Sequence, residues 1–177
     1  MILQDIFHYF CRYPSSTAVN NFFNRNSTMK GYHEMKARSL VACEEKFPEI
    51  TDYIFGVNED QIKKQISQVK GIYMFIDYGN ISSREDRLKV KEDTMQLAVT
   101  VAKPISSGSY DLAEEILITE QLLGIIAAIR KEMREDRSDP FVKRLSFPHD
   151  ITPFFARELS NSYGWTLMFN ISGIDMV

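Results

Sequence analysis

Residues 111–134 decide the fold of this chain, and they read DLAEEILITEQLLGIIAAIRKEMR. Asp111 can cap a helix, and Glu114 three residues later completes an Asp-x-x-Glu form of the capping box. The apolar side chains recur at helical spacing and form one stripe: Leu112, Ile116, Leu123, Ile126, Ile129 and Met133. Acidic residues in the first half and basic residues in the last turns complement the helix dipole. The segment therefore predicts one long amphipathic helix that ends before Asp139-Pro140.

Two strand patterns precede this helix. Residues 72–78 are apolar on both faces at first, as in a central strand. In residues 96–102, large apolar side chains alternate with smaller or polar ones, as in a half-buried strand. Between them, residues 82–93 are highly charged. Because the signs of these charges are mixed, we expect a solvated loop or the extended tip of a hairpin rather than a binding site.

The last forty residues also read as strands. Residues 141–147 and 153–159 are expected to be extended, with a turn at residues 148–150 between them. Residues 165–171 alternate clearly and place four apolar side chains on one face: Trp165, Leu167, Phe169 and Ile171. The order β-β-α-β-β predicts an α+β fold, in which a mainly antiparallel sheet is packed by one long helix.

The first 70 residues predict helices and loops rather than strands. Residues 2–12 and 27–46 have helical spacing, and a short helix is expected to begin at Asn58, a plausible N-cap. Residues 17–28 form either an irregular loop or a short helix whose two Phe side chains dock on the core. We expect residues 1–177 to be a single domain, with residues 1–70 as a helical segment before the α+β core.

Composition limits the classes of partner. The chain has 177 residues, a net charge of −3 and a pI of about 5.7, so bulk electrostatics draw it neither to nucleic acid nor to an acidic membrane. The N-terminus has no basic region and no cleavage site of a signal peptide. The expected location is the cytoplasm, or a virion or phage-like particle. The two cysteines, Cys11 and Cys43, lack metal-binding spacing and are expected to be buried thiols.

No motif predicts catalysis, a cofactor or a metal. His8 and Cys11 lie three residues apart and could supply two ligands, but a structural zinc site needs four. His149 could be a catalytic histidine whose ring is oriented by the neighbouring Asp150. A turn at these residues explains the pair more simply. There is no phosphate-binding glycine loop and no Gly-x-Ser-x-Gly. The sequence therefore predicts a non-enzymatic protein with no catalytic residues, no cofactor and no metal.

Three parts of the chain carry a resemblance to a known family. They are the strand at 96–102, the helix from Asp111 to Met133, and the ending from residues 151–155 (ITPFF) to 164–169 (GWTLMF). In this order of elements the chain resembles small tail-completion and tail-terminator proteins of tailed phages and prophages. The resemblance implies a long helix on a sheet, a charged hairpin excursion, and a ring that closes the end of a tail tube. It also implies partners: further copies of the chain and other protein subunits.

A ring uses heterologous contacts, in which different surfaces of one subunit meet. The expected contact surfaces are the charged excursion and the exposed part of the first helix, and the candidate contact residues are Ile2, Phe7, Phe10, Arg84, Asp86 and Arg87. Two alternatives stay open at this point. One is a small intracellular module that binds a ligand or a protein, and the other is a hydrolase or transferase with a site near His149.

Overall fold

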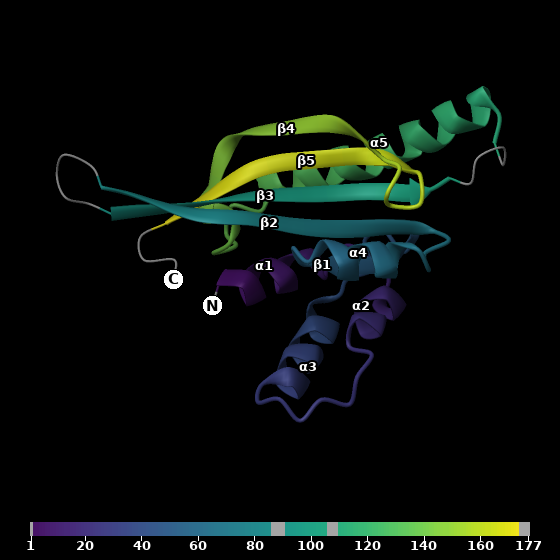
Figure 1. The fold of residues 1–177 in the computed structure, drawn as a ribbon. Helices are drawn as coiled ribbons and strands as arrows, with labels where there is room; N and C mark the ends of the chain where they lie inside the picture. The colour runs from purple at the N-terminus through teal and green to yellow at the C-terminus, as the bar shows by residue number, and fades with distance from the viewer. Residues whose placement is uncertain (1, 86–90, 106–109, 174–177) are drawn as a thin grey trace.

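The computed structural model describes residues 2–85, 91–105 and 110–173, and its elements follow the order α-α-α-β-α-β-β-α-β-β, with one 3-10 turn before the last two strands (Figure 1). Their bounds are α1 Ile2–Phe10, α2 Ser16–Phe22, α3 Tyr32–Ala42, β1 Ile50–Phe55, α4 Glu59–Ile66, β2 Ile72–Glu85, β3 Lys91–Pro104, α5 Leu112–Glu135, η1 Val142–Arg144, β4 Leu145–Ala156 and β5 Ser162–Gly173. The predicted α+β fold is confirmed.

The described strands form one sheet in the order β1-β2-β3-β5-β4. β2 and β3 are antiparallel and stay paired out to Glu85 and Lys91, so residues 82–85 and 91–93 are the two sides of a hairpin. β5 pairs with both β3 and β4 in antiparallel fashion. β1 lies parallel to β2 at one edge. The expectation that the first 70 residues hold no strand is therefore wrong.

Long helix α5 covers one face of the sheet, as predicted. Its buried side chains pack with inward residues of β3 and β5 in the main core, and α1 and α2 add to the same core beside β1 and β2. The predicted face of β5 is correct, because Leu167, Phe169 and Ile171 are buried there and Trp165 packs against them. α4 covers part of the opposite face through a smaller cluster that includes Ile62, Ile66, Tyr73 and Phe75.

The capping box of α5 is present as predicted. Asp111 accepts a hydrogen bond from the Glu114 N–H at 2.8 Å, and the Glu114 carboxylate accepts one from the Asp111 N–H at 2.9 Å. The C-terminal end of α5 is held by the N-terminal segment. Arg12 pairs with Asp136 at 2.6 Å, and Lys46 pairs with Glu132 at 2.7 Å. These contacts fix the second half of α5 against residues from the other end of the chain.

Four expectations about element bounds change, and the first is that the segment expected to be extended at 153–159 leaves β4 at Ala156 and turns. The turn expected at residues 148–150 lies inside β4, where the register with β5 shifts between Ser146 and Asp150. The strand expected at 141–147 begins instead with the 3-10 turn η1. The helix expected at 27–46 is the shorter α3, which begins after Gly31 at a positive φ of 85°.

The other N-terminal predictions hold. α1 lies within the predicted 2–12 segment, and α4 begins after Asn58, whose side chain accepts from the Gln61 N–H at 3.1 Å. Within 17–28 the second alternative is correct, because α2 ends at Phe22 and the Phe23 side chain is buried. Six-residue β1 follows α3, and its burial does not alternate.

Candidate functional site

The expected contact residues of the first helix lie in the core. Phe7 and Phe10 are fully buried and Ile2 is 8% exposed, so the expectation that these side chains form a contact surface is wrong. Phe7 lies at the centre of an aromatic cluster with rings from α2 and β1: Phe22, Phe23, Tyr53 and Phe55. The physical reason is that the short helix serves as an inner layer against the sheet, which buries its apolar side.

The hairpin formed by the ends of β2 and β3 extends beyond the body of the sheet (Figure 1). Arg84 lies on it opposite Glu92 and is exposed, as predicted. Ser83 donates a hydrogen bond to Asp93 across the two strands. The other two predicted contacts, Asp86 and Arg87, lie outside the described residues. The hairpin itself agrees with the second of the two expectations for this segment.

The first turns of α5 extend past the other end of the sheet (Figure 1). Leu112 is 80% exposed, Ile116 67% and Leu117 65%. For Leu112 and Ile116 this corrects the expectation that the whole stripe is buried. Trp165 donates a hydrogen bond from Nε1 to the Thr119 carbonyl at 3.0 Å, so β5 still holds the helix there. We call the segment 111–120 the α5 end.

The α5 end is acidic as well as apolar. It carries four carboxylates, those of Asp111, Glu114, Glu115 and Glu120, and the sequence has no Lys or Arg between Lys103 and Arg130. Sequence reasoning did not find this surface, although a signal was present. Leu117 lies off the main stripe, so the run Ile116-Leu117-Ile118 spreads apolar side chains over more of the helix than one core-facing side needs.

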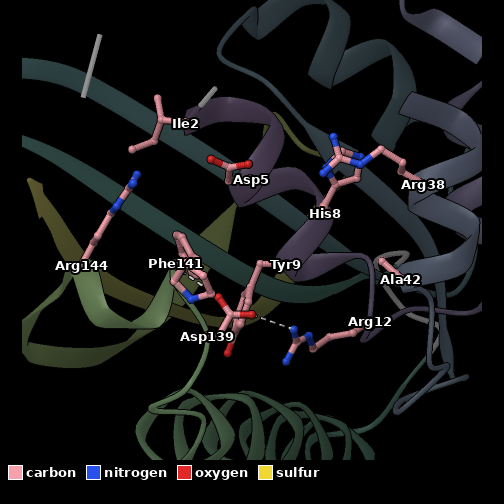
Figure 2. Close-up of a pocket in the computed structure, with 11 residues that line it drawn as sticks. Ile2, Asp5, His8, Tyr9, Arg12, Arg38, Ala42, Asp139, Phe141 and Arg144 are labelled. Carbon is pink, nitrogen blue, oxygen red and sulfur yellow. Dashed lines mark hydrogen bonds and ion pairs between the residues drawn. The ribbon is translucent and has the colours of Figure 1, made fainter. Parts of the chain in front are cut away.

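A second candidate site is a cavity of about 300 Å³ between α1, α3 and the segment that leads into η1 (Figure 2). Arg38 lies beside His8 on one side of it, and Arg144 lies on the other. Arg12 lies at its edge, paired with Asp139 at 3.3 Å and stacked over the Tyr9 ring at 4.2 Å. Burial lowers the pKa of His8, and the nearby Arg38 lowers it further. The described lining residues include no Ser, Thr or Cys nucleophile.

His149 and Asp150 differ in exposure. His149 is 5% exposed and its ring lies 5.6 Å from that of Phe169, under the C-terminal half of α5, whereas Asp150 is exposed. Successive residues of a strand point to opposite faces, which explains the separation. Burial lowers the pKa of His149, and Arg134 and Arg130 lower it further. The buried His149 and the exposed Asp150 therefore do not have the side-by-side arrangement that the hydrolase alternative expects.

The cysteines have the buried character expected of core thiols, Cys11 fully and Cys43 partly. Burial raises the pKa of both thiols, which disfavours the reactive thiolate. Within the described parts of the chain, no group of three or more His, Cys, Asp or Glu side chains could hold a metal ion. No helix among the described residues is long and apolar enough to cross a membrane.

Comparison of the chain with protein-family models, with curated proteins and with solved structures gave no match. What the protein does must therefore be argued from its own surfaces. The feature least explained by the fold is the α5 end, because its exposed side chains Leu112, Ile116 and Leu117 contribute to no described core cluster, whereas Ile118 packs against the main one.

Proposed function

We propose that this protein is a non-enzymatic structural subunit that assembles with copies of itself, in the manner of a ring-forming phage tail terminator or head-tail completion protein. The observation that carries the proposal is the exposure of Leu112, Ile116 and Leu117 within less than two turns of one helix. Single exposed apolar residues are ordinary on a soluble protein, whereas a contiguous apolar group bordered by charges is typical of a protein contact.

The hairpin of β2 and β3 adds support from the other end of the sheet. A two-stranded arm that leaves the body of a subunit gains little from its own core, since Ile81 and residues 82–85 are exposed. Such an arm can reach a neighbouring subunit. The exposed Arg84 offers a charge for that contact, in agreement with the charged excursion implied by the family resemblance.

The test is the mass of the purified protein in solution, measured by size exclusion with light scattering over a wide range of concentrations. We expect one discrete oligomer. The double variant Ile116→Ser with Leu117→Ser should shift the mass toward the monomer. Val57→Ser, which removes a side chain 54% exposed on a different part of the surface, is the matched control and should leave the mass unchanged. A wild-type monomer at every concentration would contradict the proposal.

The cavity in Figure 2 favours a second candidate function, a small module that binds an anionic group. Arg38 and Arg144 are exposed at this cavity, and guanidinium groups bind carboxylates and phosphates well. Calorimetry with inorganic phosphate and with a simple dicarboxylate tests this candidate. Saturable binding that is lost in Arg38→Gln would support it, and an absence of heat with both probes would count against it.

A further inference from the structure

Another cavity, of about 420 Å³, lies between the C-terminal end of α5, the turn η1 and the first residues of β4. The described residues that line it are three apolar and three basic side chains: Met133, Val142, Leu145, Arg134, Arg137 and His149. These residues differ from those that line the cavity in Figure 2, so the two cavities are separate sites. We call this one the α5–β4 cavity.

The described wall of the α5–β4 cavity contains no acidic residue. In the cavity of Figure 2, in contrast, the carboxylates of Asp5 and Asp139 lie among the arginines. The acidic side chains near the end of α5 pair with cations outside the α5–β4 cavity: Glu132 with Lys46 at 2.7 Å, Glu135 with Lys131 at 4.0 Å, and Asp136 with Arg12 at 2.6 Å. An anion that enters the cavity therefore meets arginine and histidine side chains and no described carboxylate in its wall.

Two exposed arginines stand at the α5–β4 cavity, Arg134 in the last turn of α5 and Arg137 just after it. Arg130 lies one turn before Arg134 on the same side of the helix and adds positive charge nearby. A guanidinium group presents its N–H donors in a plane that matches two oxygens of a phosphate or a carboxylate. Two such groups at one cavity can share a single oxyanion.

His149 is the buried part of the cavity wall, because only 5% of it is exposed. Burial lowers its pKa most, Arg134 and Arg130 on α5 lower it further, and the neighbouring Asp150 on β4 acts in the opposite direction. From β5 it is faced by the neutral ring of Phe169 at 5.6 Å. The charge of the arginines therefore reaches the ring. A bound anion would oppose that charge and raise the pKa of His149.

We infer that the α5–β4 cavity binds a phosphate group through Arg134 and Arg137, with His149 in its inner wall. Phosphate fits better than a single carboxylate, because it carries up to two negative charges near neutral pH and has oxygens for both guanidinium groups. The inference goes beyond the proposed self-assembly and does not depend on it. It also differs from the anion-binding candidate of Figure 2, which uses Arg38 and Arg144.

Calorimetry at constant ionic strength tests the site, with inorganic phosphate and phosphoserine as the two probes. We expect saturable binding. Inorganic phosphate represents the free ion and phosphoserine a phosphate group on a larger molecule, so their relative affinities identify the source. Arg137→Gln removes one guanidinium group at an exposed position, so the variant should fold. It should weaken the binding about tenfold or more, because hydrogen bonds between charged groups are strong.

The matched control is Arg25→Gln, at an exposed arginine between α2 and α3. It changes the net charge as much as Arg137→Gln does and should leave the affinity unchanged. Arg38→Gln tests the cavity of Figure 2 in the same experiment. Phosphate binding that is lost in Arg38→Gln but kept in Arg137→Gln would place the anion in that other cavity, and the inference would be wrong.

NMR titration of the histidine rings gives a second readout, which a change in surface charge alone does not move. Saturating phosphate should raise the pKa of His149 by about one unit. The pKa of His8, which lines the cavity in Figure 2, should stay nearly unchanged. A rise at His8 without one at His149 would contradict the inference.

The absence of saturable binding with both probes would also overturn the inference. The arginines would then serve only to complement the partial negative charge at the C-terminal end of α5. Neither result bears on self-assembly, which the mass of the protein in solution tests separately.

Discussion

The two halves of α5 differ in how much of their apolar surface the sheet covers. In the second half, Ile126 and Ile129 are fully buried against the sheet, whereas in the first half Leu112 is 80% exposed and Ile116 67%. The charges differ too: the first half carries acids and no Lys or Arg, whereas the second carries Arg130, Lys131 and Arg134 together with Glu132 and Glu135. The buried side of α5 is centred on Leu122 and Ile126, and Ile116 lies about 120° around the helix from Leu122, so the apolar residues of a helix do not by themselves show which of its sides the sheet covers.

The largest expected effect comes from deleting a covered apolar side chain of α5. Ile129→Ala removes a fully buried group and leaves a cavity, so the free energy of unfolding should fall by about 2–5 kcal/mol. The same change at the exposed Ile116 should stay within about 0.5 kcal/mol. Urea unfolding at a low protein concentration, where assembly adds no stability, measures both. Equal losses at the two positions would contradict the comparison.

The same contrast explains which parts of the fold could be predicted from the sequence. The capping box and the stripe specified α5 because both depend on local spacing. The exposure of Ile116 and Leu117 depends on which side of the helix the sheet covers, which is a property of the distant sheet. β1 was missed for a related reason. Its register with β2 shifts between Ile50 and Asp52, so the alternation that marks a half-buried strand is absent.

A second, smaller effect is expected at the cap of α5. Asp111→Ala removes the capping box and should cost about 1 kcal/mol of helix stability. Because the first turns are uncovered, the loss should appear as local fraying rather than as global unfolding. Amide hydrogen exchange should therefore accelerate about fivefold near residues 115–119, with little change near Ile129. Uniform acceleration along α5 would show that its two halves open as one unit.

The candidate site was predictable only in part. The charged hairpin was recognised from its composition, and Arg84 is exposed on it. Phe7 and Phe10 were assigned to a surface because they lie near a chain end, but an end of the chain is no guide to exposure. The Tyr53 hydroxyl donates to the Phe7 carbonyl at 3.0 Å, which ties α1 to β1 inside the core. This contact cannot be read from local spacing.

A buried histidine under the covered half of α5 should make the stability of the fold depend on pH. His149 lies under this half, and burial lowers its pKa below the ordinary 6.5, with Arg134 and Arg130 acting in the same direction and Asp150 against it. The unfolded chain therefore takes up the proton at a higher pH than the folded chain does. Stability is fully present above about pH 6.5 and falls as the pH decreases below it.

The measurement compares the wild type with His149→Phe by urea unfolding at several pH values. His8, whose pKa burial also lowers, is present in both proteins, so the difference between them isolates His149. The advantage of the wild type over the variant should shrink as the pH falls. A difference that does not vary with pH would show that His149 takes up its proton equally easily in the folded and the unfolded state.

The smallest effect on the isolated subunit is expected at Leu117, which lies off the stripe and is 65% exposed. Leu117→Ser should change the free energy of unfolding of the dilute protein by no more than about 0.5 kcal/mol. The concentration at which subunits associate should nevertheless rise, because the lost apolar surface is buried only in the assembly. Light scattering across a dilution series measures that shift. A side chain that contributes to association and not to folding is what distinguishes the uncovered half of α5 from the covered one. A large loss of stability without a change in association would reverse that assignment.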